Sequence, residues 1–141
     1  MLDQSNFFTI FSDGGSRGNP GKAACAYVIY KGDKIISQDA KYLGITTNNV
    51  AEYEGVLLAI KWIVNNNIKE NIIFNLDSQL VARQLAGTYK IKDEKLVKYA
   101  IEIKSLQRTH DIKIEWRHVL RDKNKIADAL LNEKLDNSSR L

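Results

Sequence analysis

The chain has 141 residues, which fits one domain able to fold around its own core. Hydrophobic residues make up 44% and charged residues 27%, so the chain is neither disordered nor of low complexity. The net charge is +4, and the single cysteine, Cys25, excludes an intrachain disulfide. No apolar run approaches the roughly 20 residues of a membrane span, and residues 1–6 lack the pattern of a signal peptide. We expect a cytoplasmic monomer in which residues 1–141 form one domain, with frayed ends at 1–6 and 136–141.

The positive charge is concentrated in one part of the sequence. Residues 90–125 contain 11 basic and 6 acidic residues, a net charge of +5, whereas the rest of the chain has a net charge of −1. A basic segment beside a nearly neutral body suggests a polyanionic partner. It is equally compatible with a lysine-rich helix face in contact with solvent.

The first third of the chain has the pattern of three strands. Phe7–Phe11 is a short apolar run that ends at the turn residues of 12–15. Ala23–Tyr30 and Ile35–Leu43 follow, joined by a turn over 31–34. Because the connections are short, these three strands should form an antiparallel meander.

The pattern then alternates between helices and strands. Apolar residues at helical spacing predict a helix over Val50–Val64, with Trp62 near its end in the core. The remaining expected elements are a strand Ile72–Leu76, helices Ser78–Ala86 and Asp93–Arg108, a strand Ile112–Trp116 with Trp116 in the core, and a helix Asp122–Leu135. The order βββαβααβα predicts an α/β fold with a mixed five-stranded sheet and helices packed on its faces.

Four acidic residues lie where separate elements of this sheet should meet. Asp13 and Asp77 follow strands one and four, and ligands bind at that edge of open α/β sheets. Glu52 and Asp128 lie in the first turns of helices that begin at the same edge. Each acid also has a structural explanation: Asp13 as a turn residue, Glu52 in the helix dipole, Asp77 as a helix cap, Asp128 facing solvent.

Convergence of these acids would require compensation of their charge. Two unit charges 4 Å apart repel by about 4 kcal/mol at an effective dielectric constant of 20. Hard divalent cations relieve this repulsion, and Mg²⁺ prefers oxygen ligands together with water and phosphate. Two such ions about 3.5–4 Å apart can activate a water on one side and stabilise the leaving oxygen on the other, which is the chemistry of phosphodiester hydrolysis.

Four motifs resemble those of the type 1 ribonuclease H family, in the family order. Asp13–Gly21 is similar to D-G-x-x-x-G-N-P-G, and Thr47–Glu52 to T-N-N-x-x-E. Asp77–Val81 is similar to D-S-Q-x-V, and Asn124–Asp128 to N-x-x-A-D. The resemblance extends from about residue 8 to residue 135, nearly the whole chain.

The resemblance implies a ribonuclease H-like fold with sheet order 3-2-1-4-5, in which only strand two is antiparallel, and helices on both faces. It implies endonucleolytic cleavage of the RNA strand of RNA–DNA hybrids, giving 5′-phosphate and 3′-hydroxyl ends, by a mechanism using two Mg²⁺ ions, with Mn²⁺ as a substitute. By position, the metal-binding and catalytic carboxylates are Asp13, Glu52, Asp77 and Asp128. The positions that match hybrid-binding residues are Gly14, Gly15, Asn19, Asn48, Asn49 and Gln79.

The amides of this set suit recognition of RNA, because a side-chain amide can both donate to and accept from a 2′-hydroxyl. Asn48 and Asn49 have an alternative explanation as helix caps. Family members also place an auxiliary His or Arg before the last motif. Here Arg121 and His118 are both candidates, and we favour Arg121 as a phosphate contact.

The chain departs from many bacterial family members in one segment. Those members carry a basic protrusion with clustered Trp residues, whereas the corresponding segment here, residues 87–98, is short and contains no Trp. The sequence therefore indicates a short form of the enzyme. Two other functions remain as alternatives: a non-catalytic hybrid-binding module, and a DNA nuclease of the same fold. The presence of all four acids argues against the first, and the T-N-N-x-x-E and D-S-Q motifs argue against the second.

Overall fold

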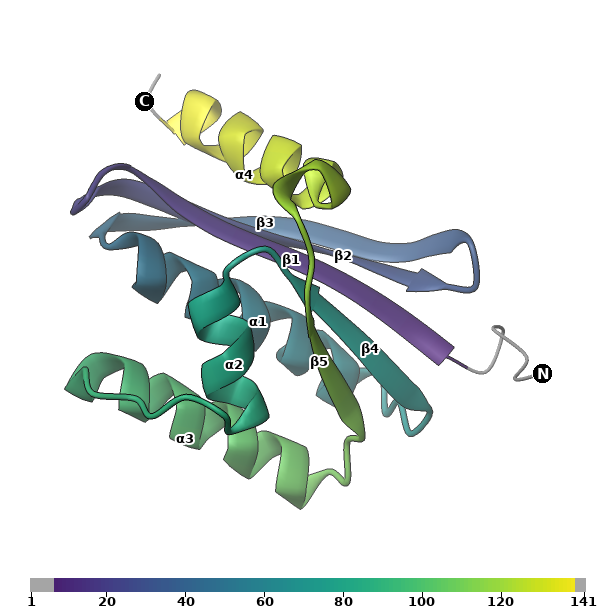
Figure 1. The fold of residues 1–141 in the computed structure, drawn as a ribbon. Coiled ribbons are helices and arrows are strands. Elements are labelled where there is room, and N and C mark those ends of the chain that lie inside the picture. Colours follow the sequence, from purple (N-terminus) through teal and green to yellow (C-terminus); the bar gives the residue numbers. More distant parts are fainter. Residues whose placement is uncertain (1–6, 139–141) are drawn as a thin grey trace.

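The structure, a computed structural model, describes residues 7–138. Its elements follow the predicted order βββαβααβα (Figure 1), with one additional 3-10 turn at Arg121–Lys123. The strands are β1 (Phe7–Gly18), β2 (Gly21–Lys31), β3 (Lys34–Thr46), β4 (Asn71–Leu76) and β5 (Ile114–His118). The helices are α1 (Asn48–Asn65), α2 (Gln79–Ala86), α3 (Glu94–Thr109) and α4 (Lys125–Ser138).

The five strands form one mixed sheet in the order β3-β2-β1-β4-β5. Strand β2 is antiparallel to both β1 and β3, whereas β4 is parallel to both β1 and β5. The predicted topology is therefore confirmed, including the single antiparallel strand.

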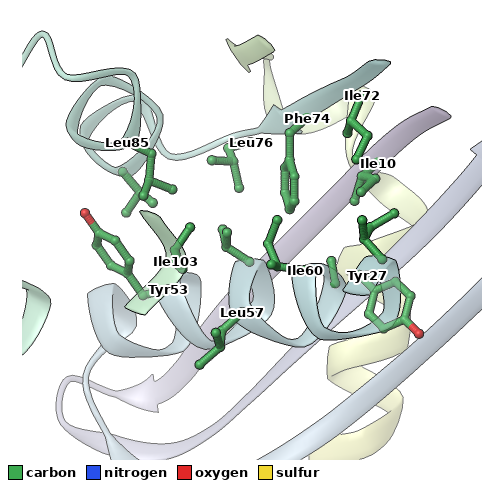
Figure 2. Close-up of a cluster of buried hydrophobic side chains, with 14 of the residues drawn as sticks. Ile10, Tyr27, Tyr53, Leu57, Ile60, Ile72, Phe74, Leu76, Leu85 and Ile103 are labelled. Carbon is green, nitrogen blue, oxygen red and sulfur yellow. The ribbon is translucent and has the colours of Figure 1, made fainter. Parts of the chain in front are cut away.

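Helices cover both faces of the sheet. Figure 1 shows α1, α2 and α3 on one face and α4 on the other. The main core lies between the sheet and α1, where Ile60 of α1 faces Phe74 of β4 and Tyr53 extends toward Leu85 of α2 (Figure 2). A smaller cluster packs Leu131 and Leu135 of α4 against alanines of β2. Both tryptophans pack against the main core as expected. Among residues 7–138, no helix has both the length and the apolar character needed to cross a membrane.

Strand β1 is longer than the sequence pattern predicts. Residues 12–15 were expected to form a turn, but the strand runs through Asp13 and the two glycines as far as Gly18. The reason is the antiparallel partner, because β2 pairs with β1 continuously from Phe8↔Lys31 to Gly18↔Gly21. The parallel pairing with β4 ends earlier, at Ser12↔Leu76. Asp13 therefore lies just past the last β1–β4 pair, although it is in the middle of its strand.

The other boundaries differ from the prediction by three residues or fewer. Strand β5 begins at Ile114 rather than Ile112, because Ile114 is the residue that aligns with Ile72 of β4. Helix α4 begins after Asn124 and continues to Ser138, so it includes residues 136–138, which we expected to fray. Leu135, just before these residues, packs against β2, and Asp136 forms an exposed ion pair of 2.7 Å with Arg17. The fraying expected at 1–6 and 139–141 concerns residues outside the described part of the chain.

Candidate active site

An open cavity of about 460 Å³ lies at the edge of the sheet where β1 and β4 part. All four sequence-predicted carboxylates line it, and they come from four different elements. The lining also includes Gly14, Gly15, Asn48, Asn49 and Arg121 from the predicted set. The four acids therefore meet at one cavity, as the sequence predicts.

The sheet places Asp13 next to Asp77. Ser12 pairs with Leu76 at the end of the parallel β1–β4 ladder, Asp13 is the next residue of β1, and Asp77 directly follows β4. The residue after Asp77, Ser78, caps α2 by accepting a hydrogen bond from the Val81 amide at 3.2 Å. Asp77 is therefore free of the capping role that the sequence left open.

Helix α1 delivers Glu52 because it crosses β1 at a glycine. A Cβ atom added to Gly14 would lie 2.1 Å from the backbone carbon of Ala51, so only glycine allows this approach. Gly55 permits a second close approach, with a Cβ position 2.9 Å from the Asp13 carbonyl oxygen. The contact buries Glu52, and because α1 begins at Asn48, Glu52 lies beyond the first turn, which argues against its explanation by the helix dipole.

Three of the four acids form a tight group. One carboxylate oxygen from each of Asp13, Glu52 and Asp77 lies within 4.8 Å of the other two. Asp128 is outside this group, on the exposed rim of the same cavity. All four acids thus line one pocket, as predicted: Asp13 and Glu52 are buried, Asp77 is half-buried beside them, and Asp128 lies at the rim.

Burial and mutual repulsion disfavour the charged forms of these acids. Burial raises the pKa of Asp13 to about 7; the charges of Asp77 and Asp128 add to this, and hydrogen bonding to Glu52 and the Gly14 amide opposes it. Burial, followed by the charge of Asp13, raises the pKa of Glu52 well above its ordinary value. The site therefore favours any cation that can replace the missing solvation.

Asp77 is the least perturbed of the three. Burial raises its pKa, whereas a hydrogen bond from Asn124 and the positive charge of Arg121 lower it. His118 also lowers the pKa of Asp77 by its charge, although it does not line the cavity. Both auxiliary candidates are thus within electrostatic reach of the acids, and only Arg121 borders the cavity.

Asp128 is held by its own helix. The Asn132 side chain, one turn further along α4, donates to the Asp128 carbonyl at 2.9 Å and to its carboxylate at 3.3 Å. Arg17 from the end of β1 donates weakly to Asn132 at 3.4 Å and pairs with Asp136. Asn132 and Arg17 also line the cavity. Neither Asn132 nor Arg17 belongs to the predicted set, although the spacing of four residues between Asp128 and Asn132 places the two side chains on the same face of a helix.

Two of the predicted hybrid-binding amides, Asn19 and Asn48, have side-chain oxygens that already accept hydrogen bonds. Asn48 accepts from the amide and the hydroxyl of Ser16 at 2.8 and 3.0 Å, and Asn19 accepts from the Asn48 backbone amide at 3.1 Å. Thr47 provides the cap of α1 instead, accepting from Val50. The side-chain NH₂ groups of Asn19 and Asn48 have no partner among the described residues, which leaves them available as donors.

The remaining predicted residues are placed differently from one another. Gly15 lines the cavity, and Asn49 lies beside Asn48 on the exposed first turn of α1. Asn19, in the β1–β2 turn, and Gln79, at the exposed start of α2, are outside the cavity lining. The structure thus brings most, but not all, of the predicted set to one surface.

Comparison with known proteins gives a consistent match. Residues 11–134 match the reverse transcriptase-like family. Ribonuclease HI of Halobacterium salinarum is 37% identical over 131 residues, which are 91% of this chain and 64% of that protein. A bifunctional protein of Mycobacterium tuberculosis is 35% identical over 130 residues; the match covers 90% of this chain and only 35% of that protein's length. Among solved structures, LC11-RNase H1 in complex with an RNA/DNA hybrid superposes with a TM-score of 0.86 at 32% identity, covering 93% of this chain and 98% of that one.

Proposed function

The chain belongs to the reverse transcriptase-like family, as a ribonuclease H-like domain of type 1, and on that premise we propose that it hydrolyses the RNA strand of RNA–DNA hybrids. The observation that carries the proposal is the group of Asp13, Glu52 and Asp77, whose carboxylate oxygens lie within 4.8 Å of one another at the edge of the sheet. The similarity to ribonuclease HI and to a hybrid-bound ribonuclease H1 supports the same conclusion.

The donor set fits a divalent cation. The Oε2 atom of Glu52 is buried and has no hydrogen-bond partner among the described residues, although an unsatisfied buried acceptor is costly. All donors in the group are carboxylate oxygens, which suit hard ions such as Mg²⁺ or Mn²⁺. We propose that Asp13, Glu52, Asp77 and Asp128 together hold two Mg²⁺ ions when substrate is bound. Such ions would supply an activated water nucleophile and stabilisation of the departing 3′-oxygen.

The other residues of the site would bind and orient the hybrid. The free NH₂ groups of Asn19 and Asn48, together with Asn49 and Gln79, can donate to 2′-hydroxyl or base-edge acceptors in the minor groove. Gly14 and Gly15 line the cavity, where the β1 backbone would contact a ribose. Arg121, at the cavity border, is suited to a phosphate of the RNA strand.

His118 is the second auxiliary candidate. It ends β5, opposite Leu76, and is exposed to solvent. From that position it can exchange protons with water near Asp77 or assist departure of the product. Substitution of Arg121 should raise the KM for hybrid, whereas substitution of His118 should lower kcat.

Several broader features belong to the same proposal. We propose that the chain acts as one catalytic domain, as a monomer and in the cytoplasm. The free cysteine, Cys25, is buried, which is compatible with a reducing compartment. Size-exclusion chromatography with light scattering and cell fractionation test the last two points.

The direct test is cleavage of one end-labelled strand in three duplexes: the RNA strand of an RNA–DNA hybrid, one strand of double-stranded DNA and one strand of double-stranded RNA. The proposal predicts Mg²⁺-dependent cleavage of the hybrid, with 5′-phosphate and 3′-hydroxyl ends, and none in EDTA. Cleavage of double-stranded DNA in preference to the hybrid would identify a DNA nuclease. Binding of the hybrid in Ca²⁺ without cleavage in Mg²⁺ would identify a binding module.

A further inference from the structure

Asn124 connects the segments that carry three of the four acids. Its side-chain nitrogen donates to the carbonyl oxygen of Ser12, the residue before Asp13, at 2.8 Å. The same nitrogen donates to the Asp77 carboxylate at 3.1 Å. Its backbone carbonyl accepts from the amide of Asp128 at 3.2 Å. One residue thus contacts β1, the end of β4 and the first turn of α4.

The ordinary explanation of this asparagine is a helix cap, because Asn124 immediately precedes α4. A capping side chain accepts hydrogen bonds through its oxygen. In Asn124 the oxygen is buried and has no partner among residues 7–138, whereas the nitrogen makes both contacts. The side chain therefore acts as a donor toward the acids and not as a cap for the helix.

The surroundings make this contact rigid. Asn124 is 1% exposed, so its amide has little freedom to turn away from Asp77. The backbone amide of Asn124 donates to Arg121 at 2.9 Å, which fixes the 3-10 turn before it. The donor consequently holds one oxygen of Asp77 in a defined direction and leaves the other oxygen for a ligand.

We propose that Asn124 is a positioning residue that orients Asp77 and fixes the start of α4, and with it Asp128, relative to Asp13. The inference rests on the proposed metal-dependent function and concerns how this chain organises its acids before metal binds. It predicts that loss of the amide nitrogen weakens divalent-ion binding in the absence of nucleic acid, and lowers kcat more than it raises the KM for hybrid.

The test compares Asn124→Ser and Asn124→Ala with the wild type. Serine caps helices about as well as asparagine but is too short to reach Asp77, so the two explanations predict different results for this variant. Mn²⁺ binding to the nucleic-acid-free protein is measured by isothermal titration calorimetry, with thermal melting in EDTA to confirm folding. Asn137→Ala, on the exposed part of α4, is the matched control.

We expect both Asn124 variants to bind Mn²⁺ about tenfold more weakly, the usual effect of removing a partner of a metal ligand. Their kcat should fall by a similar factor while KM changes by about twofold or less. Wild-type affinity and kcat in Asn124→Ser, with a loss only in Asn124→Ala, would establish capping as its role and overturn the proposal. A wild-type protein that binds no Mn²⁺ and cleaves no hybrid would instead refute the proposed function itself.

Discussion

Replacing Asp13 by asparagine should stabilise the metal-free protein while abolishing cleavage. Burial raises the pKa of Asp13 from its usual 3.8 to about 7. Each tenfold change in proton affinity corresponds to about 1.4 kcal/mol, so ionised Asp13 costs the folded protein up to about 4 kcal/mol. Because Glu52 shares this proton-binding site, we expect a gain of about 2–4 kcal/mol for Asp13→Asn at pH 8.

The pH dependence gives the sign of this effect. The folded state binds the proton of Asp13 more tightly than the unfolded state does, since its pKa is raised on folding. The stability that Asp13 contributes is therefore fully present below about pH 4 and is lost as the pH rises through about 7. Asp13→Asn removes this loss, so its advantage over the wild type should be small at pH 4 and largest at pH 8.

Urea unfolding in EDTA at pH 4, 6 and 8 measures the difference. Asp33→Asn, in the exposed β2–β3 turn, removes a carboxylate of the same type and should leave stability unchanged within about 0.5 kcal/mol. An Asp13→Asn variant that is less stable than the wild type at pH 8, or whose stability differs from that of the wild type by the same amount at all three pH values, would show that the acids do not repel as the geometry indicates.

Three further predictions concern the frame of the site. Gly14→Ala should lower the free energy of unfolding by about 3–5 kcal/mol, because its Cβ would lie 2.1 Å from the Ala51 backbone. Gly15→Ala should be tolerated, since the atom nearest to its Cβ is 3.6 Å away, and thermal melting compares the two variants. Tyr53→Phe should cost about 1–3 kcal/mol in chemical denaturation, because it leaves the buried Gln84 oxygen without the 2.7 Å bond it accepts; an unchanged midpoint would contradict this. Hybrid affinity in Ca²⁺ should fall steeply with salt, since phosphate contacts release counterions; a flat response would count against the basic segment 90–125 as a binding face.

The order of the elements and the identity of the four acids were predictable from the sequence. Hydrophobic periodicity is local information, and the motifs mark Asp13, Glu52, Asp77 and Asp128 without reference to the fold. The sheet order followed from the family resemblance, and the structure confirms it.

The end of β1 was not predictable from local pattern. An Asp followed by two glycines is typical of a turn, and only the antiparallel pairing with β2 keeps these residues extended. Gly14 is required there for a tertiary reason, because it must admit the backbone of α1.

The division of the acids into a close group of three, two of them buried, and one at the rim was also beyond the sequence. It depends on where α1 crosses β1 and on the start of α4, which the Asn124 side chain sets through Ser12. An asparagine before a helix indicates a cap, and nothing in the pattern shows that its nitrogen rather than its oxygen is used.

The most direct test of the account is anomalous diffraction from crystals of the protein grown with Mn²⁺ and an RNA–DNA hybrid, using Asp77→Asn to prevent turnover. We predict Mn²⁺ density in contact with Asp13 and Glu52, with the scissile phosphate of the RNA strand beside it. Crystals that hold the hybrid on another face of the protein, or that show no metal at these carboxylates, would contradict it.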